Sequence, residues 1–254
     1  MQVSNITVSH DGKINHVDNV STIIPRGKIT TIIGPNGCGK STLLGTLSRE
    51  NKPQQGQVYL EEQDIVQYKP KEFAKKLAIV YQQNQTPKDI TIEKLVSFGR
   101  LPYQSMFTNT QDADNEAINW ALESTNLLEK RYTDLEALSG GERQRVWIAM
   151  ALAQKAEILC LDEPTTYLDM YYQLELLALI QKLNQTYGLT IVMVLHDINQ
   201  AIRYSDHLIM MKQGKIVAEG APSLLTAKNI KEVYDVNVAF KHDELGAYIV
   251  PLGV

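Results

Sequence analysis

Short apolar runs rich in β-branched residues alternate with turn residues over the first 33 positions of the chain. Such runs predict strands, and here they fall at residues 2–8, 17–24 and 28–33. The segment 29–33 is β-branched throughout and leads directly into a glycine-rich stretch. We expect a helix to follow that stretch, from about residue 39 to residue 49.

Helical periodicity replaces the strand pattern over about residues 72–154. Within this block, helices are expected to begin near Glu93 and to cover residues 112–122 and 143–154. Further on, the pattern predicts a core-packed helix at 172–183 and apolar strands at 157–161, 190–195, 207–211 and 215–218, the last two as a hairpin. Strands that alternate with helices predict an α/β fold around a mostly parallel sheet, with the central helical block as an insertion.

A glycine-rich motif follows the strand at 28–33 and matches the pattern G-x-x-x-x-G-K-[ST] fully. Its glycines let successive backbone N–H groups point at phosphates, and the helix that follows adds its positive N-terminal end. Lys40 is expected to reach the β- and γ-phosphates, Ser41 to place its hydroxyl on Mg²⁺, and Cys38 to act as a spacer. The predicted nucleotide-binding residues of this phosphate-binding loop are Gly34, Pro35, Asn36, Gly37, Cys38, Gly39, Lys40, Ser41 and Thr42.

Two consecutive acids end the short apolar strand at 157–161. Asp162 stands at the strand's end and is expected to hold Mg²⁺ through a water molecule. Glu163 comes one residue later, so its side chain should leave at a different angle and reach the attacking water as general base. The loop and the acid pair together predict a Mg²⁺-dependent nucleoside triphosphate site, which a kinase, a GTPase, a motor or a transporter ATPase could contain.

A second anion site is predicted where the chain reads LSGGERQR, at residues 138–145. Ser139 is a favourable N-cap, and Gly140 and Gly141 leave backbone N–H groups uncovered at the start of a long helix. One γ-phosphate does not need two anion sites, the phosphate-binding loop and this helix start, within one subunit. We therefore expect Ser139, Gly140, Gly141 and Glu142 to close on a nucleotide held by the phosphate-binding loop of a second copy.

Composition bears on the partners and the compartment of the protein. The formal net charge of −4 provides no global electrostatic case for nucleic-acid binding. The two cysteines, Cys38 and Cys160, form no disulfide framework, which favours a reducing compartment. No signal peptide is apparent, and the apolar runs are far shorter than the ~20 residues that span a bilayer, so a partner must hold the protein at any membrane.

These motifs resemble, in their order along the chain, the ATP-binding cassette (ABC) family, whose signature reads L-S-G-G-Q. The resemblance covers essentially the whole sequence. It implies a P-loop NTPase of the ABC ATPase fold, with a mostly parallel core sheet, an N-terminal antiparallel β subdomain and an inserted α-helical subdomain. Residues 1–254 then form a single ABC ATPase domain, with the nucleotide-binding core at about 1–85 and 157–254 and the helical subdomain at about 86–156.

The resemblance also implies roles for single residues. Gln82 matches the glutamine that senses Mg²⁺ and the γ-phosphate. Asp169 matches the acid of the D-loop and is included among the predicted nucleotide-binding residues. His196 matches the switch histidine that contacts the γ-phosphate. His10 aligns with the aromatic residue that stacks on adenine, but an ordinary loop histidine is an equally good interpretation.

Three positions depart from the family pattern. Glu142 stands where glutamine is commonest, and its charge near a phosphate is expected to tune the site rather than to abolish it. Tyr81 replaces a proline that commonly precedes the glutamine, and Tyr167 stands where a small residue is usual. These two tyrosines have no mechanism assigned.

Residues 86–103 and 195–201 look most like the ATPases of ferric-siderophore importers, within a branch that also imports haem and cobalamin. The resemblance implies a cytoplasmic subunit, peripheral on the inner face of the cell membrane, that serves a separate integral permease and, indirectly, an extracytoplasmic substrate-binding protein. Two copies would sandwich two ATP molecules as a homodimer, and a groove near residues 82–103 would grip a permease helix.

Other functions stay open at this point. Haem or cobalamin import is one alternative, and a soluble cassette ATPase without a transporter, such as an iron–sulfur assembly factor, is another. A nucleic-acid or translation-associated cassette protein would usually show tandem cassettes or a long coiled-coil insertion, and neither fits in 254 residues.

Overall fold

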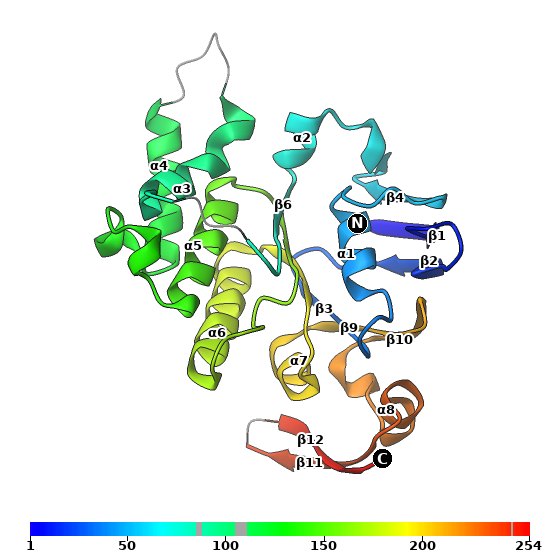
Figure 1. Ribbon diagram of the computed structural model, residues 1–254. Helices are drawn as coiled ribbons and strands as arrows, with labels where there is room; N and C mark the ends of the chain where they lie inside the picture. Colours follow the sequence, from blue (N-terminus) through cyan, green and yellow to red (C-terminus); the bar gives the residue numbers. More distant parts are fainter. Residues whose placement is uncertain (85–87, 105–110, 245) are drawn as a thin grey trace. The chain divides into compact units, whose positions relative to one another are not determined.

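The computed structural model describes residues 1–84, 88–104, 111–244 and 246–254. The chain divides into two compact units, one formed by residues 1–67 and 190–254 and the other by residues 68–189. Figure 1 labels the helices and strands of both units. The single domain expected from the sequence, with a nucleotide-binding core at about 1–85 and 157–254 and a helical subdomain at about 86–156, stays a prediction.

The first unit contains an antiparallel sheet with the strand order β2-β1-β4-β5. β1 pairs with β2 on one side and with β4 on the other, and β4 pairs with the short β5. The sequence pattern predicted β1 and β2 but not the other two strands. The bounds are Gln2–Val8 for β1, Val17–Ile23 for β2, Gln55–Leu60 for β4 and Gln63–Asp64 for β5.

The same unit contains a second set of strands in the order β10-β9-β3-β8. β3 runs parallel to both β8 and β9, and every residue of β3 and β8 is buried, as is typical of parallel strands covered on both faces. All four strands were predicted, including the β9–β10 hairpin. Their bounds are Ile29–Ile33 for β3, Thr190–Val194 for β8, His207–Lys212 for β9 and Lys215–Gly220 for β10.

Helix α1, Lys40–Leu47, follows β3 directly and confirms the predicted strand, loop and helix order. The remaining elements of this unit were not predicted. Asn199 of α7 holds the C-terminal hairpin, because its amide donates to the Ile249 carbonyl at 3.2 Å and accepts from the Ile249 N–H at 2.8 Å. The remaining elements, which were not predicted, are α7 (Ile198–Tyr204), α8 (Ala227–Tyr234), β11 (Asn237–Asp243) and β12 (Gly246–Gly253).

The second unit is mostly helical. Helix α5 packs against α3 and α4, and Figure 1 shows these three side by side. The predicted helices at 112–122, 143–154 and 172–183 correspond to α4, α5 and α6. The bounds are Pro70–Ala74 for α2, Ile92–Ser97 for α3, Gln111–Ser124 for α4, Gly140–Ala153 for α5 and Met170–Tyr187 for α6.

The strand β6, Leu77–Val80, corrects the sequence interpretation, which assigned residues 72–154 to a helical block. β6 pairs in parallel with β7, Ile158–Leu161, and the Asp162 N–H extends the pairing by donating to the Val80 carbonyl at 2.9 Å. A run of four apolar residues has the same pattern in a buried strand as in a buried helix. Only its pairing with a distant strand distinguishes the two.

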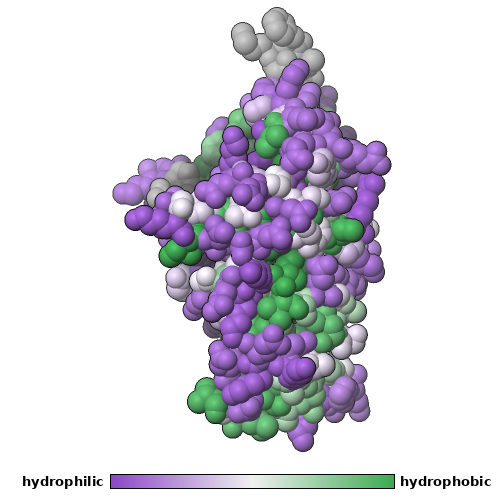
Figure 2. Space-filling view, turned by 90° about the vertical axis from the view of Figure 1, so that its right-hand side faces the viewer, coloured by the Kyte–Doolittle hydropathy of each residue, from purple (hydrophilic) through white to green (hydrophobic). Residues whose placement is uncertain are grey.

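Hydrophilic residues cover most of the face shown in Figure 2, and the hydrophobic residues visible there gather mainly below the middle of the view. Among the described residues, no helix combines the length and the apolar character that a bilayer crossing requires.

Candidate functional site

The phosphate-binding loop, residues 34–42, begins at the carboxyl end of β3 and leads into α1. Gly39 is the N-cap of α1 with a φ of 101°, and a Cβ atom there would lie 2.0 Å from the His16 carbonyl oxygen. A Cβ atom at Gly34 would lie 2.3 Å from the Met211 carbonyl oxygen. The loop therefore runs so close to its neighbours that only glycine fits at these two positions.

Lys40 is only 5% exposed although it carries a charge. Its Nζ donates to the carbonyl oxygens of Gly34 at 2.9 Å and of Pro35 at 3.1 Å. A buried ammonium needs such partners, because burial without them costs free energy. The loop itself thus holds the Lys40 side chain over the segment where phosphates are predicted to bind.

Cys38 is buried inside the loop, and burial raises the pKa of its thiol. Its carbonyl accepts a hydrogen bond from the Gly214 N–H at 3.0 Å, which ties the loop to the β9–β10 turn. A buried, protonated thiol is a poor nucleophile, so its surroundings agree with a spacer role.

The first unit also contains both histidines of the predicted site. His10 is exposed, and its Nε2 lies 3.5 Å from the Thr42 hydroxyl at the end of the phosphate-binding loop. His196 follows β8, and the Leu195 N–H before it donates to the Ile32 carbonyl at 3.3 Å. Because β3 and β8 are parallel, His196 and the phosphate-binding loop leave the sheet at the same edge.

The second unit brings Gln82, Asp162 and Glu163 together at the ends of β6 and β7. Gln82 Nε2 donates to Glu163 Oε2 at 2.5 Å, and the Thr166 hydroxyl donates to the same oxygen at 3.2 Å. The parallel pairing of Val80 with Leu161 explains this arrangement, since it places the residues after the two strands next to each other. The two hydrogen bonds orient the carboxylate that is predicted to act as general base.

The backbone at Glu163 lies in the left-handed region with a φ of 48°, and Tyr167 follows with a φ of 65°. Such conformations cost about 1 kcal/mol or more for residues other than glycine, and they persist where the surrounding structure enforces them. The left-handed backbone at Glu163 ends the extended conformation of β7, whose pairing the Asp162 N–H still continues. The different angles expected for the side chains of these two acids stay a prediction.

The predicted signature segment, residues 139–142, is the start of α5, and Ser139 is its N-cap. Ser139 and Glu142 form a capping box: the Glu142 N–H donates to Ser139 Oγ at 3.3 Å, and the Ser139 N–H donates to Glu142 Oε2 at 2.9 Å. Glu142 Oε1 also lies 2.5 Å from Lys130 Nζ. The acid that departs from the family pattern is thus built into the cap of the helix.

The Lys130 ammonium, followed by the N–H and hydroxyl of Ser139, lowers the pKa of Glu142 to about 2. The folded pKa lies below the ordinary value, so the ionised carboxylate stabilises the folded protein at pH values above about 4.5. This contribution is lost as the pH falls toward about 2. Glu142 therefore carries a full negative charge at neutral pH.

Asp169 is the N-cap of α6, and its side chain accepts from the Tyr172 N–H at 3.1 Å. The same helix start packs on the signature segment, because a Cβ atom at Gly141 would lie 2.6 Å from Cδ1 of the Tyr172 ring. Leu168 Cδ2 would lie 3.9 Å from a Cβ atom at Gly140. The structure thus joins the signature segment and the predicted D-loop into one packed cluster.

Two residues of this cluster, Lys130 and Tyr172, were missed by the sequence analysis. A capping box, S-x-x-E, was readable at Ser139 and Glu142, but nothing in the sequence points to a lysine earlier in the chain as the partner of its acid. Tyr172 lies on the predicted helix at 172–183 and was assigned to packing alone.

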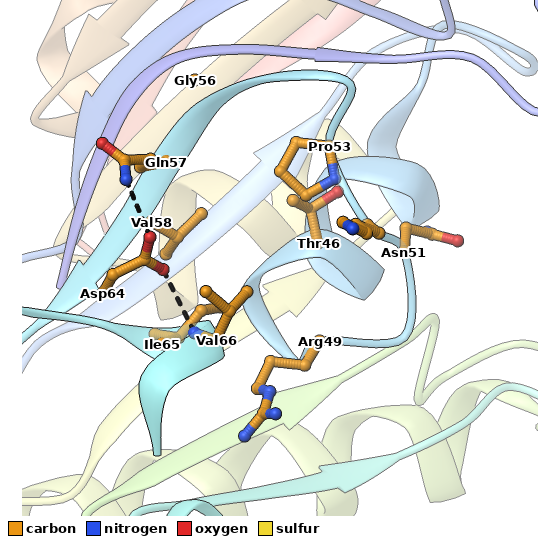
Figure 3. A pocket seen from close by; sticks show the side chains of 11 residues that line it. Thr46, Arg49, Asn51, Pro53, Gly56, Gln57, Val58, Asp64, Ile65 and Val66 are labelled. Carbon is orange, nitrogen blue, oxygen red and sulfur yellow. Dashed lines mark hydrogen bonds between the residues drawn. The ribbon is translucent and has the colours of Figure 1, made fainter.

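A cavity of about 400 Å³ lies in the first unit, at the end of α1 and beside β4 and β5. Figure 3 shows Asp64 at its wall, where it accepts from Gln57 Nε2 at 2.9 Å and from the Val66 N–H at 3.1 Å. No predicted site residue lines this cavity. The buried Asp64 has hydrogen-bond donors from its own unit, and the cavity adds nothing to the candidate site.

Comparison with known proteins gives the family. The model of the ABC transporter family matches residues 17–166. The chain is 48% identical over 228 residues to the iron(3+)-hydroxamate import ATP-binding protein FhuC of Bacillus subtilis, covering 89% of this chain and 85% of FhuC. It is 46% identical over 245 residues to the ferric enterobactin transport ATP-binding protein FepC of Escherichia coli, covering 95% of this chain and 90% of FepC.

Solved structures agree. A metal-chelate type ABC transporter in an inward-facing conformation has a chain with a TM-score of 0.84 at 25% identity, covering 99% of this chain and 96% of that one. The dimeric cassette MJ0796, in a post-hydrolysis state with ADP and Pi, has a TM-score of 0.74 at 30% identity, covering 87% of this chain and 98% of its own. The chain therefore belongs to the ABC transporter family, as an ATP-binding and ATP-hydrolysing cassette.

Proposed function

We propose that this protein is the ATPase subunit of an importer that takes up ferric siderophores through a separate membrane permease. The observation that carries the proposal is similarity at 46–48% identity, over most of both chains, to ATP-binding proteins named for iron(3+)-hydroxamate and ferric enterobactin transport. It favours siderophores over haem, cobalamin and a transporter-free cassette ATPase. The protein would act on the cytoplasmic face of the membrane, with an extracytoplasmic binding protein delivering the ferric siderophore to the permease.

ATP binding is assigned to the phosphate-binding loop, with Lys40 on the β- and γ-phosphates and His196 on the γ-phosphate. The residues that would hold Mg²⁺ are Ser41, Gln82 and Asp162, which offer a hydroxyl, an amide oxygen and a carboxylate. These are the oxygen ligands that Mg²⁺ prefers, and this ion takes its remaining ligands from phosphate and water. When bound, Mg²⁺ would neutralise charge on the phosphates.

Glu163 is assigned the role of general base toward the attacking water. The hydrogen bonds from Gln82 and Thr166 to its carboxylate support this role, because they fix the orientation of the acceptor. Through its hydrogen bond to Glu163, Gln82 is the residue that would transmit the state of the nucleotide to the helical subdomain at 86–156. The proposed permease groove, residues 82–103, includes residues 85–87, which lie outside the described residues.

The active form is proposed to be a homodimer, in which residues 139–142 of each subunit close on ATP bound to the other. The dimeric cassette among the similar structures supports this arrangement. In this chain the N-cap geometry of α5 supports it as well, since the N–H groups of Gly140 and Gly141 start a helix of 14 residues and carry its positive end. Asp169 would act in the same interface from the start of α6.

Transport in cells tests the proposal. A strain that lacks this protein but keeps its neighbouring permease should fail to accumulate radioactive iron supplied as a ferric hydroxamate or a ferric catecholate siderophore. The parental chain should restore uptake of one of these, while the Glu163→Gln variant should not. Normal siderophore uptake in the deletion strain, with a selective loss of haem or cobalamin uptake, would overturn the assignment.

The stacking role of His10 has its own test. Replacement with alanine should weaken ATP binding a few-fold, since aromatic stacking contributes about 0.5–1.5 kcal/mol, and should leave binding of inorganic triphosphate unchanged. Titration calorimetry measures both ligands, with His242→Ala, an exposed histidine of β11, as the matched control. Equal losses for ATP and triphosphate would show that His10 does not contact adenine.

A further inference from the structure

Ser139 already has its hydrogen bonds satisfied within its own chain. Its hydroxyl donates to Glu142 Oε2 at 2.9 Å, its N–H donates to the same oxygen at 2.9 Å, and its Oγ accepts from the Glu142 N–H at 3.3 Å. A carboxylate oxygen therefore takes both donors of the residue that is assigned to bind phosphate. An arriving phosphate oxygen must displace Glu142 Oε2 before it can accept a hydrogen bond from the Ser139 hydroxyl.

The charge of Glu142 adds to this competition. The carboxylate is ionised at neutral pH and is mostly buried, with 18% of its side chain exposed. A triphosphate that approaches the start of α5 therefore meets a like charge at short range. Without compensation, one such charge a few ångströms away weakens the binding of an anion roughly tenfold.

Lys130 supplies the compensating charge. Its Nζ lies 2.5 Å from Glu142 Oε1, the oxygen that Ser139 does not use, while 54% of the lysine side chain remains exposed. The turn that carries Lys130 is itself anchored, because the Arg131 guanidinium pairs with Glu93 and the Arg131 carbonyl accepts from the Glu93 N–H at 2.8 Å. The lysine is thus held beside the acid by the start of α3.

We propose that Lys130 is a positioning residue of the signature segment, which neutralises Glu142 so that Ser139 can exchange the carboxylate for a phosphate oxygen of ATP on the second subunit. The inference rests on the proposed function, because it concerns the closure of the dimer on ATP. The exchange moves hydrogen bonds only: the Ser139 hydroxyl changes its acceptor, and Glu142 keeps its bond to Lys130.

The test uses a double-mutant cycle on the purified full-length protein in a Glu163→Gln background, in which the ATP-bound dimer accumulates, with Lys130→Gln, Glu142→Gln and the double variant. Lys130→Gln should weaken ATP-driven dimerisation roughly tenfold, measured by sedimentation, and should leave ATP affinity of the single subunit unchanged. The dimerisation affinity of the double variant should match that of Glu142→Gln within about twofold, because no uncompensated charge remains at residue 142. Lys130→Arg should behave like the parental protein, and Lys182→Gln, an exposed lysine on α6, is the control for loss of a charge.

The outcomes distinguish a failure of the Lys130 inference from a failure of the proposed function. If Lys130→Gln weakens dimerisation equally whether residue 142 is glutamate or glutamine, the lysine acts by another route and the inference fails. An unchanged Lys130→Gln variant overturns it too. A parental protein that neither dimerises with ATP nor hydrolyses it would instead refute the proposed function, independently of Lys130.

Discussion

Replacing Glu163 with glutamine is expected to lower the rate of ATP hydrolysis by roughly 10²–10⁴-fold while ATP binding is kept. An amide cannot take a proton from water at neutral pH, whereas the carboxylate can. Glutamine has nearly the same shape, and its amide oxygen can accept the bonds that Gln82 and Thr166 now donate to Glu163 Oε2. The loss should therefore fall on kcat rather than on folding.

The measurement is steady-state phosphate release together with the oligomeric state in ATP. We expect the Glu163→Gln variant to accumulate as an ATP-bound dimer, because closure no longer leads to hydrolysis. Glu123→Gln, an exposed glutamate on α4, is the matched control and should hydrolyse ATP at the parental rate. Parental turnover in Glu163→Gln would remove Glu163 from the role of general base.

Replacing Lys40 with alanine is expected to weaken ATP binding itself, by roughly 10- to 100-fold. A charge-assisted hydrogen bond to a phosphate contributes about 1.5–3 kcal/mol, and alanine removes it altogether. We expect this loss of ATP affinity to be specific to Lys40. Its side chain is buried, and the carbonyls of Gly34 and Pro35 already hold its Nζ over the loop.

Equilibrium binding of a fluorescent ATP analogue measures this effect. Lys228→Ala, an exposed lysine on α8, is the matched control, and circular dichroism checks that both variants fold. An unchanged affinity in a folded Lys40→Ala protein would contradict the phosphate contact. The two predictions are distinct, because Glu163→Gln separates hydrolysis from binding and Lys40→Ala removes binding first.

Much of the fold was readable from local pattern. The strands β1, β2, β3 and β8 and the helices α1, α4 and α6 lie where apolar periodicity placed them, to within a few residues at each end. The elements that were missed are short or weakly patterned, such as β5 with two residues and α2 with five. Such elements owe their stability to pairing and packing rather than to their own sequence.

The sequence by itself determined the chemistry: a glycine-rich loop with Lys40, consecutive acids at Asp162 and Glu163, and the helix start at Ser139. These signals are local, because each depends on residue types at fixed short spacings in one segment. Only the tertiary structure decided which partners these residues have. Gln82 meets Glu163 across 81 positions of the chain, and Lys130 meets Glu142 across 12, through strand pairing and helix packing that no local pattern encodes.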